Sequence, residues 1–175
     1  EPLLPEKIYD LNGHTLCAAV QEAGGKAVNL GIVPDKKDQL TKALKKALDS
    51  ADVVITSGGV SVGPKDFTPQ VVDSLGKPGV LVSGIRVKPG KPMTIAVVDG
   101  KIVFSLPGNP TSSLFMFYVF VHPVLVKMAG RPNEEPPNVR AVAVQKMFPA
   151  RGRRTFTMVK LAYDKTGRLV VSPVP

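Results

Sequence analysis

Apolar and polar residues alternate with two different periods along the first 130 residues. Apolar residues recur at helical spacing over 10–23 and 36–50, which predicts two amphipathic helices. Runs rich in β-branched residues over 27–33, 52–57 and 80–87 predict strands buried on both faces. Strands that alternate with helices predict an α/β domain of three layers, in which helices cover both faces of a mostly parallel sheet.

One hairpin interrupts this alternation. Asp99-Gly100 joins two β-rich runs, 93–98 and 101–106, and Asp-Gly between such runs is the strongest short-range signal for a hairpin. A short helix is expected over 69–75, where Gly76 ends it.

The helix expected over 111–129 is apolar nearly all round. Its central run, 114–126, is shorter than the roughly 20 residues that a membrane-spanning helix needs. His122-Pro123 is expected to interrupt it as well. We therefore expect no membrane span, and we expect the helix to be buried by the sheet on one side and by a second subunit on the other.

Proline-rich segments divide the chain. Residues 1–6 read as a linker, and the acidic, proline-rich segment 133–138 is the clearest domain boundary. The domain between them covers 7–132. The remainder, 139–175, predicts short strands at 139–144, 156–163 and 169–171, which are too few for a complete core and indicate an incomplete β domain.

The net charge of +9 belongs to the last part of the chain. Residues 1–138 carry 15 Lys+Arg and 13 Asp+Glu, whereas residues 139–175 carry 8 and 1. The basic segment lacks the interleaved aromatic residues of a nucleic-acid stacking platform, so an anionic small molecule or an acidic partner surface is at least as plausible a ligand.

Cysteine and histidine are too scarce to carry metal or disulfide chemistry. The single cysteine, Cys17, cannot form an internal disulfide, which fits a reducing cytoplasm. With two histidines in addition, a zinc site is improbable. The first residues also lack the basic and apolar regions of a signal peptide, so we expect a cytoplasmic protein.

A hydrolase motif occurs without its catalytic partners. Residues 59–63 read G-x-S-x-G, the nucleophile elbow of α/β hydrolases. The only later histidine, His122, falls inside the apolar helix, and no oxyanion segment precedes the motif. Ser61 is therefore not expected to be a nucleophile. The glycine patterns of dinucleotide-binding and P-loop proteins do not occur.

Three glycine-containing loops follow expected strands and predict an anion site. Free backbone N–H groups, hydroxyl groups and a helix N-terminus all favour phosphate or another oxyanion there, although each loop alone could be an ordinary turn. The expected binding residues are Ser57, Gly58, Gly59, Ser61, Gly63, Lys88, Gly90, Lys91, Pro107, Gly108, Asn109, Pro110, Thr111 and Ser112.

Three aspartates, Asp10, Asp35 and Asp66, each follow an apolar run. In a parallel sheet such ends gather at one edge. Carboxylates next to phosphate loops indicate Mg²⁺, which prefers carboxylate and phosphate oxygens. Asp10 and Asp35 could equally be simple helix caps.

Five motifs in order over residues 8–130 resemble the MoeA family of molybdopterin molybdenumtransferases, to which the gephyrin E domain also belongs. They are Tyr9-Asp10-x-Asn12, Asn29 to Val33, Ser57 to Gly63 with Asp66, Lys88 to Pro92, and Leu106 to Pro110. The resemblance implies a MogA-like molybdopterin-binding domain followed by the start of a C-terminal β domain.

The resemblance also implies an activity. MoeA-like enzymes insert molybdate into adenylylated molybdopterin with Mg²⁺ and release AMP. Asp10 and Asp66 match the family's aspartates and are the expected catalytic residues. All three aspartates are expected metal ligands, Asp35 because of its position after an apolar run. Pro64 departs from the family, which often has Glu there. The expected partners are a second copy of the chain and an upstream MogA-type adenylyltransferase.

Two other functions remain open. MogA-like proteins adenylylate molybdopterin, but they usually carry Gly-Gly-Thr-Gly where this chain has Gly58-Gly59-Val60-Ser61. A gephyrin-like, non-enzymatic binding module is the other alternative.

Overall fold

The computed structural model describes residues 7–60, 67–132 and 137–174. The chain divides into two compact units, and each is described by itself. The first comprises residues 1–85 and 90–133, and the second comprises residues 86–89 and 134–175. Much of the predicted linker 133–138 lies outside the described residues, so the predicted domain limits stay a prediction.

A four-stranded mixed sheet forms the centre of the first unit. Its order is β1 (Val53–Ser57), β5 (Lys101–Leu106), β4 (Thr94–Val98) and β2 (Pro78–Ser83). Only β1 and β5 run parallel, whereas the β5–β4 and β4–β2 pairs are antiparallel. The predicted α/β class is confirmed, but the sheet of the described residues is mixed and not mostly parallel.

The predicted hairpin explains much of why the sheet is mixed and not mostly parallel. Asp99 and Gly100 have φ angles of 48° and 86°, so both central residues lie in the left-handed region that a tight hairpin turn requires. β4 therefore turns directly back along β5.

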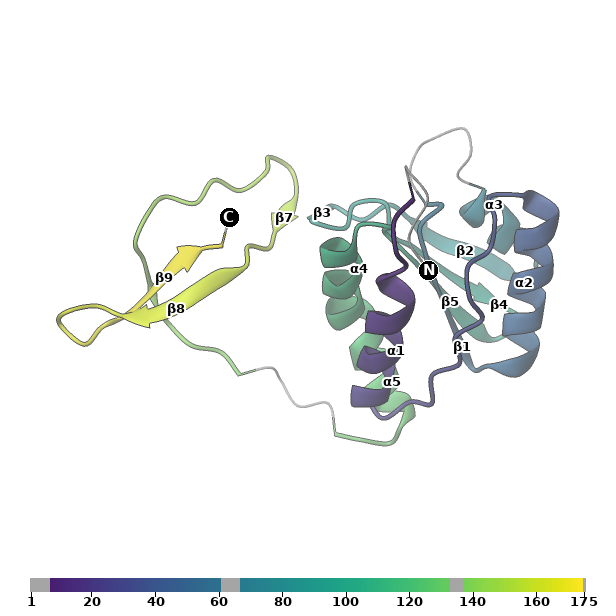
Figure 1. Ribbon diagram of the computed structural model, residues 1–175, viewed down its shortest axis with the longest axis horizontal. Helices are drawn as coiled ribbons and strands as arrows, with labels where there is room; N and C mark the ends of the chain where they lie inside the picture. The colour runs from purple at the N-terminus through teal and green to yellow at the C-terminus, as the bar shows by residue number, and fades with distance from the viewer. Residues whose placement is uncertain (1–6, 61–66, 133–136, 175) are drawn as a thin grey trace. The chain divides into compact units, whose positions relative to one another are not determined.

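Helices cover both faces of the sheet, as Figure 1 shows. α2 (Lys37–Ser50) and α3 (Thr68–Asp73) lie on one face, and α1 (Asn12–Glu22) lies on the other together with the long apolar helix. The α2 stripe of Leu44, Ala47 and Leu48 forms a buried cluster with sheet residues such as Val103. The apolar spacing in the sequence predicted this contact correctly.

The apolar helix is continuous. It consists of α4 (Pro110–Met116), a π-helical turn (Phe117–Val121) and α5 (His122–Met128). The predicted interruption at His122-Pro123 is wrong, because the wider turn accommodates the proline, and the His122 N–H bonds the Phe117 carbonyl five residues back.

The uninterrupted helix, Pro110–Met128, is as long as the expected range 111–129. At 19 residues, it is long and apolar enough to cross a membrane by length and composition alone, a criterion that core helices of soluble proteins also meet. Met116, Phe117 and Val121 are fully buried, so one face of the helix belongs to the core.

The strand expected over 27–33 does not form among the described residues. Val28, Leu30 and Ile32 are 62%, 42% and 79% exposed. A strand needs a neighbour for its backbone groups, and β1 is the last strand of the sheet on its side.

The second unit contains two small sheets. β3 (Val87–Lys88) pairs in parallel with β7 (Arg154–Thr155), so the strand predicted over 80–87 divides into β2 and β3. The other sheet has the order β6 (Val142–Ala143), β9 (Leu169–Pro173) and β8 (Val159–Tyr163). All five residues of β8 are exposed, which agrees with the expectation of few strands around a thin core.

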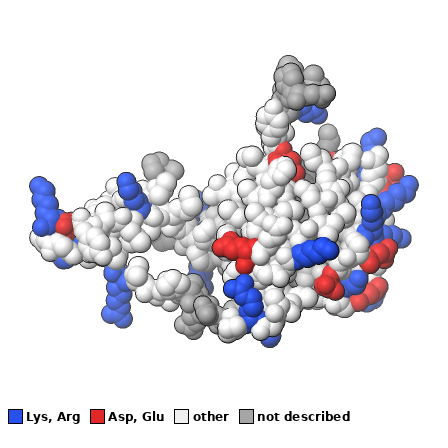
Figure 2. All heavy atoms as spheres, turned by 60° about the horizontal axis from the view of Figure 1, so that its bottom comes forward, with Lys and Arg blue, Asp and Glu red and all other residues white. Residues whose placement is uncertain are grey.

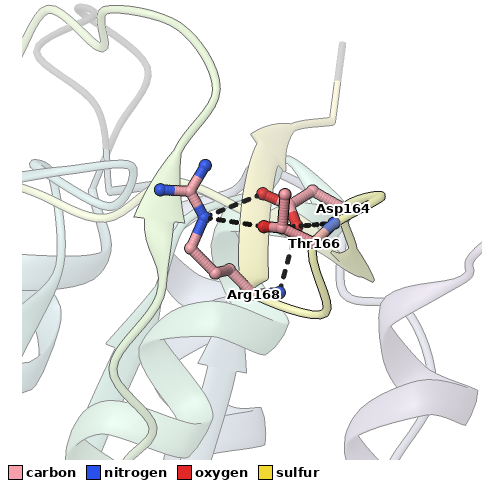
Figure 3. A network of polar contacts seen from close by, with 3 residues as sticks. All are labelled: Asp164, Thr166 and Arg168. Carbon is pink, nitrogen blue, oxygen red and sulfur yellow. Dashed lines mark hydrogen bonds and ion pairs between the residues drawn. The ribbon is translucent and has the colours of Figure 1, made fainter.

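A polar turn joins β8 to β9 (Figure 3). The Asp164 carboxylate accepts hydrogen bonds from the Thr166 hydroxyl and backbone and from the Arg168 backbone, and it pairs with the Arg168 guanidinium at 3.0 Å. These contacts, of which the hydrogen bond from the Thr166 hydroxyl has the largest effect, lower the pKa of Asp164 to about 2.

In the view of Figure 2 acidic and basic side chains intermingle on the first unit, whereas the second unit shows mostly basic ones.

Candidate functional site

Two predicted loops meet where the parallel strands β1 and β5 end. Ser57, the last residue of β1, stands opposite Leu106, the last residue of β5. The Gly58 N–H donates to the Leu106 carbonyl at 3.0 Å. A Cβ on Gly108 would lie 3.5 Å from the Gly58 Cα, so the two loop backbones are in van der Waals range. The carboxyl ends of parallel strands are the usual place for a ligand in an α/β sheet.

Asn12 ties the first turn of α1 to both loops. Its Nδ2 donates to the Ser57 Oγ at 2.7 Å and to the Gly108 carbonyl at 2.9 Å. The Ser57 hydroxyl in turn donates to the Pro107 carbonyl at 3.0 Å and lies 3.4 Å from the Ser113 hydroxyl. The sequence offered Asn12 as a possible cap of the first helix and Ser113 as one of the hydroxyls at the start of the apolar helix, but it predicted neither of these contacts.

The orientation of the Asn12 amide follows from these contacts. Both amide hydrogens are used, and turning the amide over would place its oxygen against the Gly108 carbonyl oxygen. The Oδ1 atom is buried and has no hydrogen-bond partner among the described residues. A buried acceptor without a donor costs about 1–3 kcal/mol.

Asp10 lies beside this network at the start of α1. Its Oδ1 accepts the Gly13 N–H at 2.9 Å, which is a capping contact. Gly13 leaves room for these side chains, because a Cβ there would lie 2.3 Å from the Asp10 Oδ2 and 3.0 Å from the Asn29 amide nitrogen. The capping alternative for Asp10 is therefore supported, and its expected roles as metal ligand and catalytic residue stay predictions.

The N-terminus of α4 offers fewer free donors than the sequence suggested. The Asn109 Oδ1 accepts the Ser112 N–H at 3.1 Å, and the Asn109 carbonyl accepts the Ser113 N–H at 2.8 Å. Pro110 has no N–H. The Ser112 hydroxyl also donates to the Asn109 Oδ1, at 3.3 Å. Among the described residues, the Thr111 N–H and the Thr111 hydroxyl are therefore the donors of this turn left for a ligand.

Two further predicted glycines are explained by close packing. Gly59 has a φ of +67°, and a Cβ there would lie 2.5 Å from the Thr68 hydroxyl oxygen. Gly90 has a φ of +105°, and a Cβ there would lie 2.3 Å from the Met116 sulfur. The second contact joins Gly90 to the last residue of α4.

The remaining predicted residues lie apart from this network or outside the described residues. Lys91 is exposed, and Lys88 lies in β3 of the second unit. Asp35 is exposed and forms no hydrogen bond or ion pair with the described network. Ser61, Gly63, Pro64 and Asp66 lie outside the described residues. Within the described ranges, no group of three or more His, Cys, Asp or Glu side chains could hold a metal ion.

A shallow cavity of about 320 Å³ lies at the opposite end of the sheet. Its lining residues are Lys45, Leu48, Asp49, Leu75, Val98, Asp99 and Lys101. It adjoins the turn between β4 and β5, not the carboxyl ends of β1 and β5, so it is separate from the candidate site.

The fold is that of an α/β domain, and the loop network marks a candidate site at the carboxyl ends of two parallel strands. A family model described as "Probable molybdopterin binding domain" matches residues 1–127, and the chain belongs to this family.

Proteins similar to the chain carry consistent names. A molybdopterin molybdenumtransferase of Haemophilus influenzae is 35% identical over 99% of the chain and 43% of its own length. One of Nostoc sp. is 40% identical over 74% of the chain and 30% of its own length. A crystal structure of a molybdopterin biosynthesis MoeA protein from Pyrococcus horikosii superposes with a TM-score of 0.80 at 38% identity, covering 98% of this chain and 41% of that one. The chain thus spans less than half the length of these relatives.

Proposed function

We propose that this chain is the molybdopterin-binding part of a molybdopterin molybdenumtransferase. In that reaction molybdate enters the dithiolene of adenylylated molybdopterin, and AMP leaves. The observation that carries the proposal is the junction of the loops 57–59 and 107–110 at the ends of β1 and β5, braced by Asn12. The similar proteins named molybdenumtransferases support the choice of ligand.

The described residues would act by binding and orienting the phosphate end of the ligand. The Thr111 N–H and the Thr111 hydroxyl are the donors at the start of α4, and the Ser112 hydroxyl would join them only by leaving the Asn109 Oδ1. Ser57 would hold the adjoining loop at a fixed distance, because its hydroxyl bonds Pro107 and accepts from Asn12. Lys91 would add positive charge near the phosphate, as its position after Gly90 suggests.

Mg²⁺ fits this proposal through Asp10. Magnesium is commonly held by one or two carboxylates together with substrate phosphates. One oxygen of Asp10 caps α1, and the other, Oδ2, makes no hydrogen bond among the described residues. The ion would neutralise phosphate charge when bound. Asp35 and Asp66 remain proposed ligands.

The proposal extends to the setting of the enzyme. The similar proteins are bacterial and archaeal enzymes of molybdenum cofactor synthesis by their names. We infer a cytoplasmic homodimer that receives adenylylated molybdopterin from a MogA-type protein, and neither a nucleic acid nor a membrane as a partner.

Binding of molybdopterin to the 175-residue chain tests the proposal. Ser57→Ala removes the hydroxyl that bonds Pro107 and Asn12, so we expect affinity to fall about tenfold, corresponding to roughly 1.4 kcal/mol. Ser50→Ala is the matched control, because the Ser50 hydroxyl bonds the Lys46 carbonyl at the far end of α2. Unchanged binding by Ser57→Ala, or no binding by the unaltered chain, would contradict the proposed site.

The alternatives are separated by reactivity. A molybdopterin adenylyltransferase would transfer AMP from Mg²⁺-ATP to molybdopterin, whereas the proposed enzyme would consume adenylylated molybdopterin only when molybdate is present. A purely binding module would do neither, and its affinity for a partner peptide would be unaffected by Ser57→Ala.

A further inference from the structure

Three hydroxyl side chains stand side by side across the central sheet. Ser105 of β5 lies opposite Thr56 of β1 on one side and opposite Thr94 of β4 on the other. Residues that lie opposite one another on neighbouring strands point to the same face of a sheet, so the three hydroxyls form one line across it. We call Thr56, Ser105 and Thr94 the hydroxyl row.

The hydroxyl row is buried beneath the helices α2 and α3, which cover this face of the sheet (Figure 1). The next row on the same face includes Val54 and Val103, and both belong to the apolar cluster that these helices form with the sheet. Thr94 and Ser105 are each 1% exposed, and the hydroxyl oxygen of half-buried Thr56 is buried as well. The three hydroxyls therefore lie at the margin of an apolar core, away from bulk water.

None of the three hydroxyl oxygens has a hydrogen-bond partner among the described residues. Buried hydroxyls in folded proteins are mostly hydrogen-bonded to protein atoms or to ordered water, because an unpaired one is destabilising. Packing gives no reason for a hydroxyl at position 105, since serine, unlike valine, is not a residue that strands favour. Three adjacent hydroxyls without protein partners therefore need a shared polar ligand.

The spacing of the hydroxyl row fits water. Opposite residues on neighbouring strands have Cβ atoms about 4.5–5.5 Å apart. A water molecule with a hydrogen bond of about 2.8 Å to each of two oxygens joins oxygens that are about 4.5 Å apart. One water in each gap would therefore satisfy all three hydroxyls. The row also has a route to the surface, because exposed Ser83 of β2 lies opposite Thr94 and continues the same line of hydroxyls.

We propose that the hydroxyl row is a binding site for internal water, with one water bridging Thr56 and Ser105 and another bridging Ser105 and Thr94. The first water joins β1 to β5 one residue before Ser57 and Leu106, where the loops of the candidate site begin. It holds the spacing of the two strand ends from the face that α2 and α3 cover. Thr56 and Ser105 are thus positioning residues for the junction of the two loops.

Oxygen-17 magnetic relaxation dispersion, which counts the internal waters of a protein in solution, tests the site on the full 175-residue chain. Ser105→Ala removes the hydroxyl that both waters share, so this variant should lose both. Thr94→Val keeps the shape of the side chain and should lose only the second water. Thr41→Val is the matched control, because the Thr41 hydroxyl bonds the Lys37 carbonyl within α2, and it should keep both.

Thermal denaturation and hydrogen exchange of the same variants test what the waters do. If the row holds water, Thr94→Val and Ser105→Ala should each lower Tm by about 2–4 °C. The Gly58 N–H, which closes the loop junction, should exchange several-fold faster in Ser105→Ala. The Asp99 N–H, which is hydrogen-bonded at the other end of the sheet, is the control and should not change.

Four results would overturn the inference. An unchanged water count together with a higher Tm would show that the hydroxyls are dry and unpaired, because apolar replacements then remove a destabilising group. An unchanged water count together with a lower Tm would show that the hydroxyls bond one another directly. Equal water counts in Thr94→Val and the unaltered chain would remove Thr94 from the site. Unchanged exchange of the Gly58 N–H in Ser105→Ala would remove the positioning role.

Discussion

Replacing Gly90 by alanine would test whether the loop after β3 is set by its contact with α4. Gly90 is buried, and its φ of +105° lies in the region that side chains with a Cβ rarely adopt. The added Cβ would lie 2.3 Å from the sulfur and 2.5 Å from the Cγ of Met116. Met116 is fully buried, so its side chain has little room to move away.

Two costs should add in this variant. The left-handed backbone costs about 1–2 kcal/mol for a residue with a Cβ, and overpacking a core side chain costs about 1–3 kcal/mol. We therefore expect Gly90→Ala to lower the free energy of unfolding by about 3 kcal/mol. In a protein of this size that corresponds to a fall in Tm of about 6–12 °C.

The assay is thermal and urea denaturation of four variants. Gly100→Ala is the matched control, because Gly100 has a φ of +86° and nothing lies within 4 Å of a Cβ there. Gly100→Ala should lower the free energy of unfolding by the cost of the left-handed backbone alone, about 1–2 kcal/mol. In a Met116→Ala background the overlap disappears, so Gly90→Ala should also cost only about 1–2 kcal/mol there.

The reasoning fails if Gly90→Ala and Gly100→Ala lose the same stability. It also fails if Gly90→Ala costs as much in the Met116→Ala background as in the unaltered chain. Either result would mean that the backbone angle, and not the packing of this loop on α4, requires glycine at position 90.

Three further substitutions have expected outcomes. Asn109→Ala removes the side-chain cap of α4 and should lower stability by about 1 kcal/mol, whereas Asn109→Asp should retain most of it in denaturant titrations. The pKa of Asp164 is lowered to about 2, so the contribution of this carboxylate to stability is present above the ordinary value of 3.8 and is lost as the pH falls toward 2. The difference in Tm between the unaltered chain and Asp164→Asn should therefore disappear as the pH is lowered over that range. The hydrogen bond from the Tyr118 hydroxyl to Glu22, at 2.6 Å, raises the pKa of Tyr118 above 10.0, so Tyr118→Phe should remove a transition above pH 10.0 from an alkaline absorbance titration.

Each of these has a clear contrary result. Equal stability of Asn109→Ala and Asn109→Asp would show that the cap contributes nothing. A Tm gap for Asp164→Asn that widens in acid would contradict the direction of its pKa shift. If the transition that Tyr118→Phe removes is centred at or below pH 10.0, the contact with Glu22 does not form in solution.

Local signals in the sequence were sufficient to predict where the helices and the hairpin form. The apolar stripe of α2 and the Asp99-Gly100 turn are each specified by a few neighbouring residues, and both are confirmed. The direction of the strands is not determined by neighbouring residues. β4 turns back at the hairpin, and β2 pairs with β4 in antiparallel fashion. The sheet is therefore mixed, although the sequence pattern had predicted a mostly parallel one.

The loops of the candidate site were recognised by their glycines and hydroxyls, but their connections were not. The bonds of Asn12 to Ser57 and Gly108 span 45 and 96 residues. No spacing rule relates positions so far apart, since only the fold brings them together. Asn109 is a different case, because it caps α4 through the Ser112 N–H only three residues later, and asparagine is a preferred N-cap. This local contact could have been predicted, and it uses a donor that the sequence suggested was free for a ligand.

By itself, the sequence determined the family, the helices and the loops that belong to the site, because these depend on residue types within short windows. Only the tertiary structure decided which loops meet, which donors remain free, and that 27–33 forms no strand among the described residues. A strand exists only where another backbone satisfies its hydrogen bonds. That partner is a property of the assembled sheet and not of the seven residues themselves.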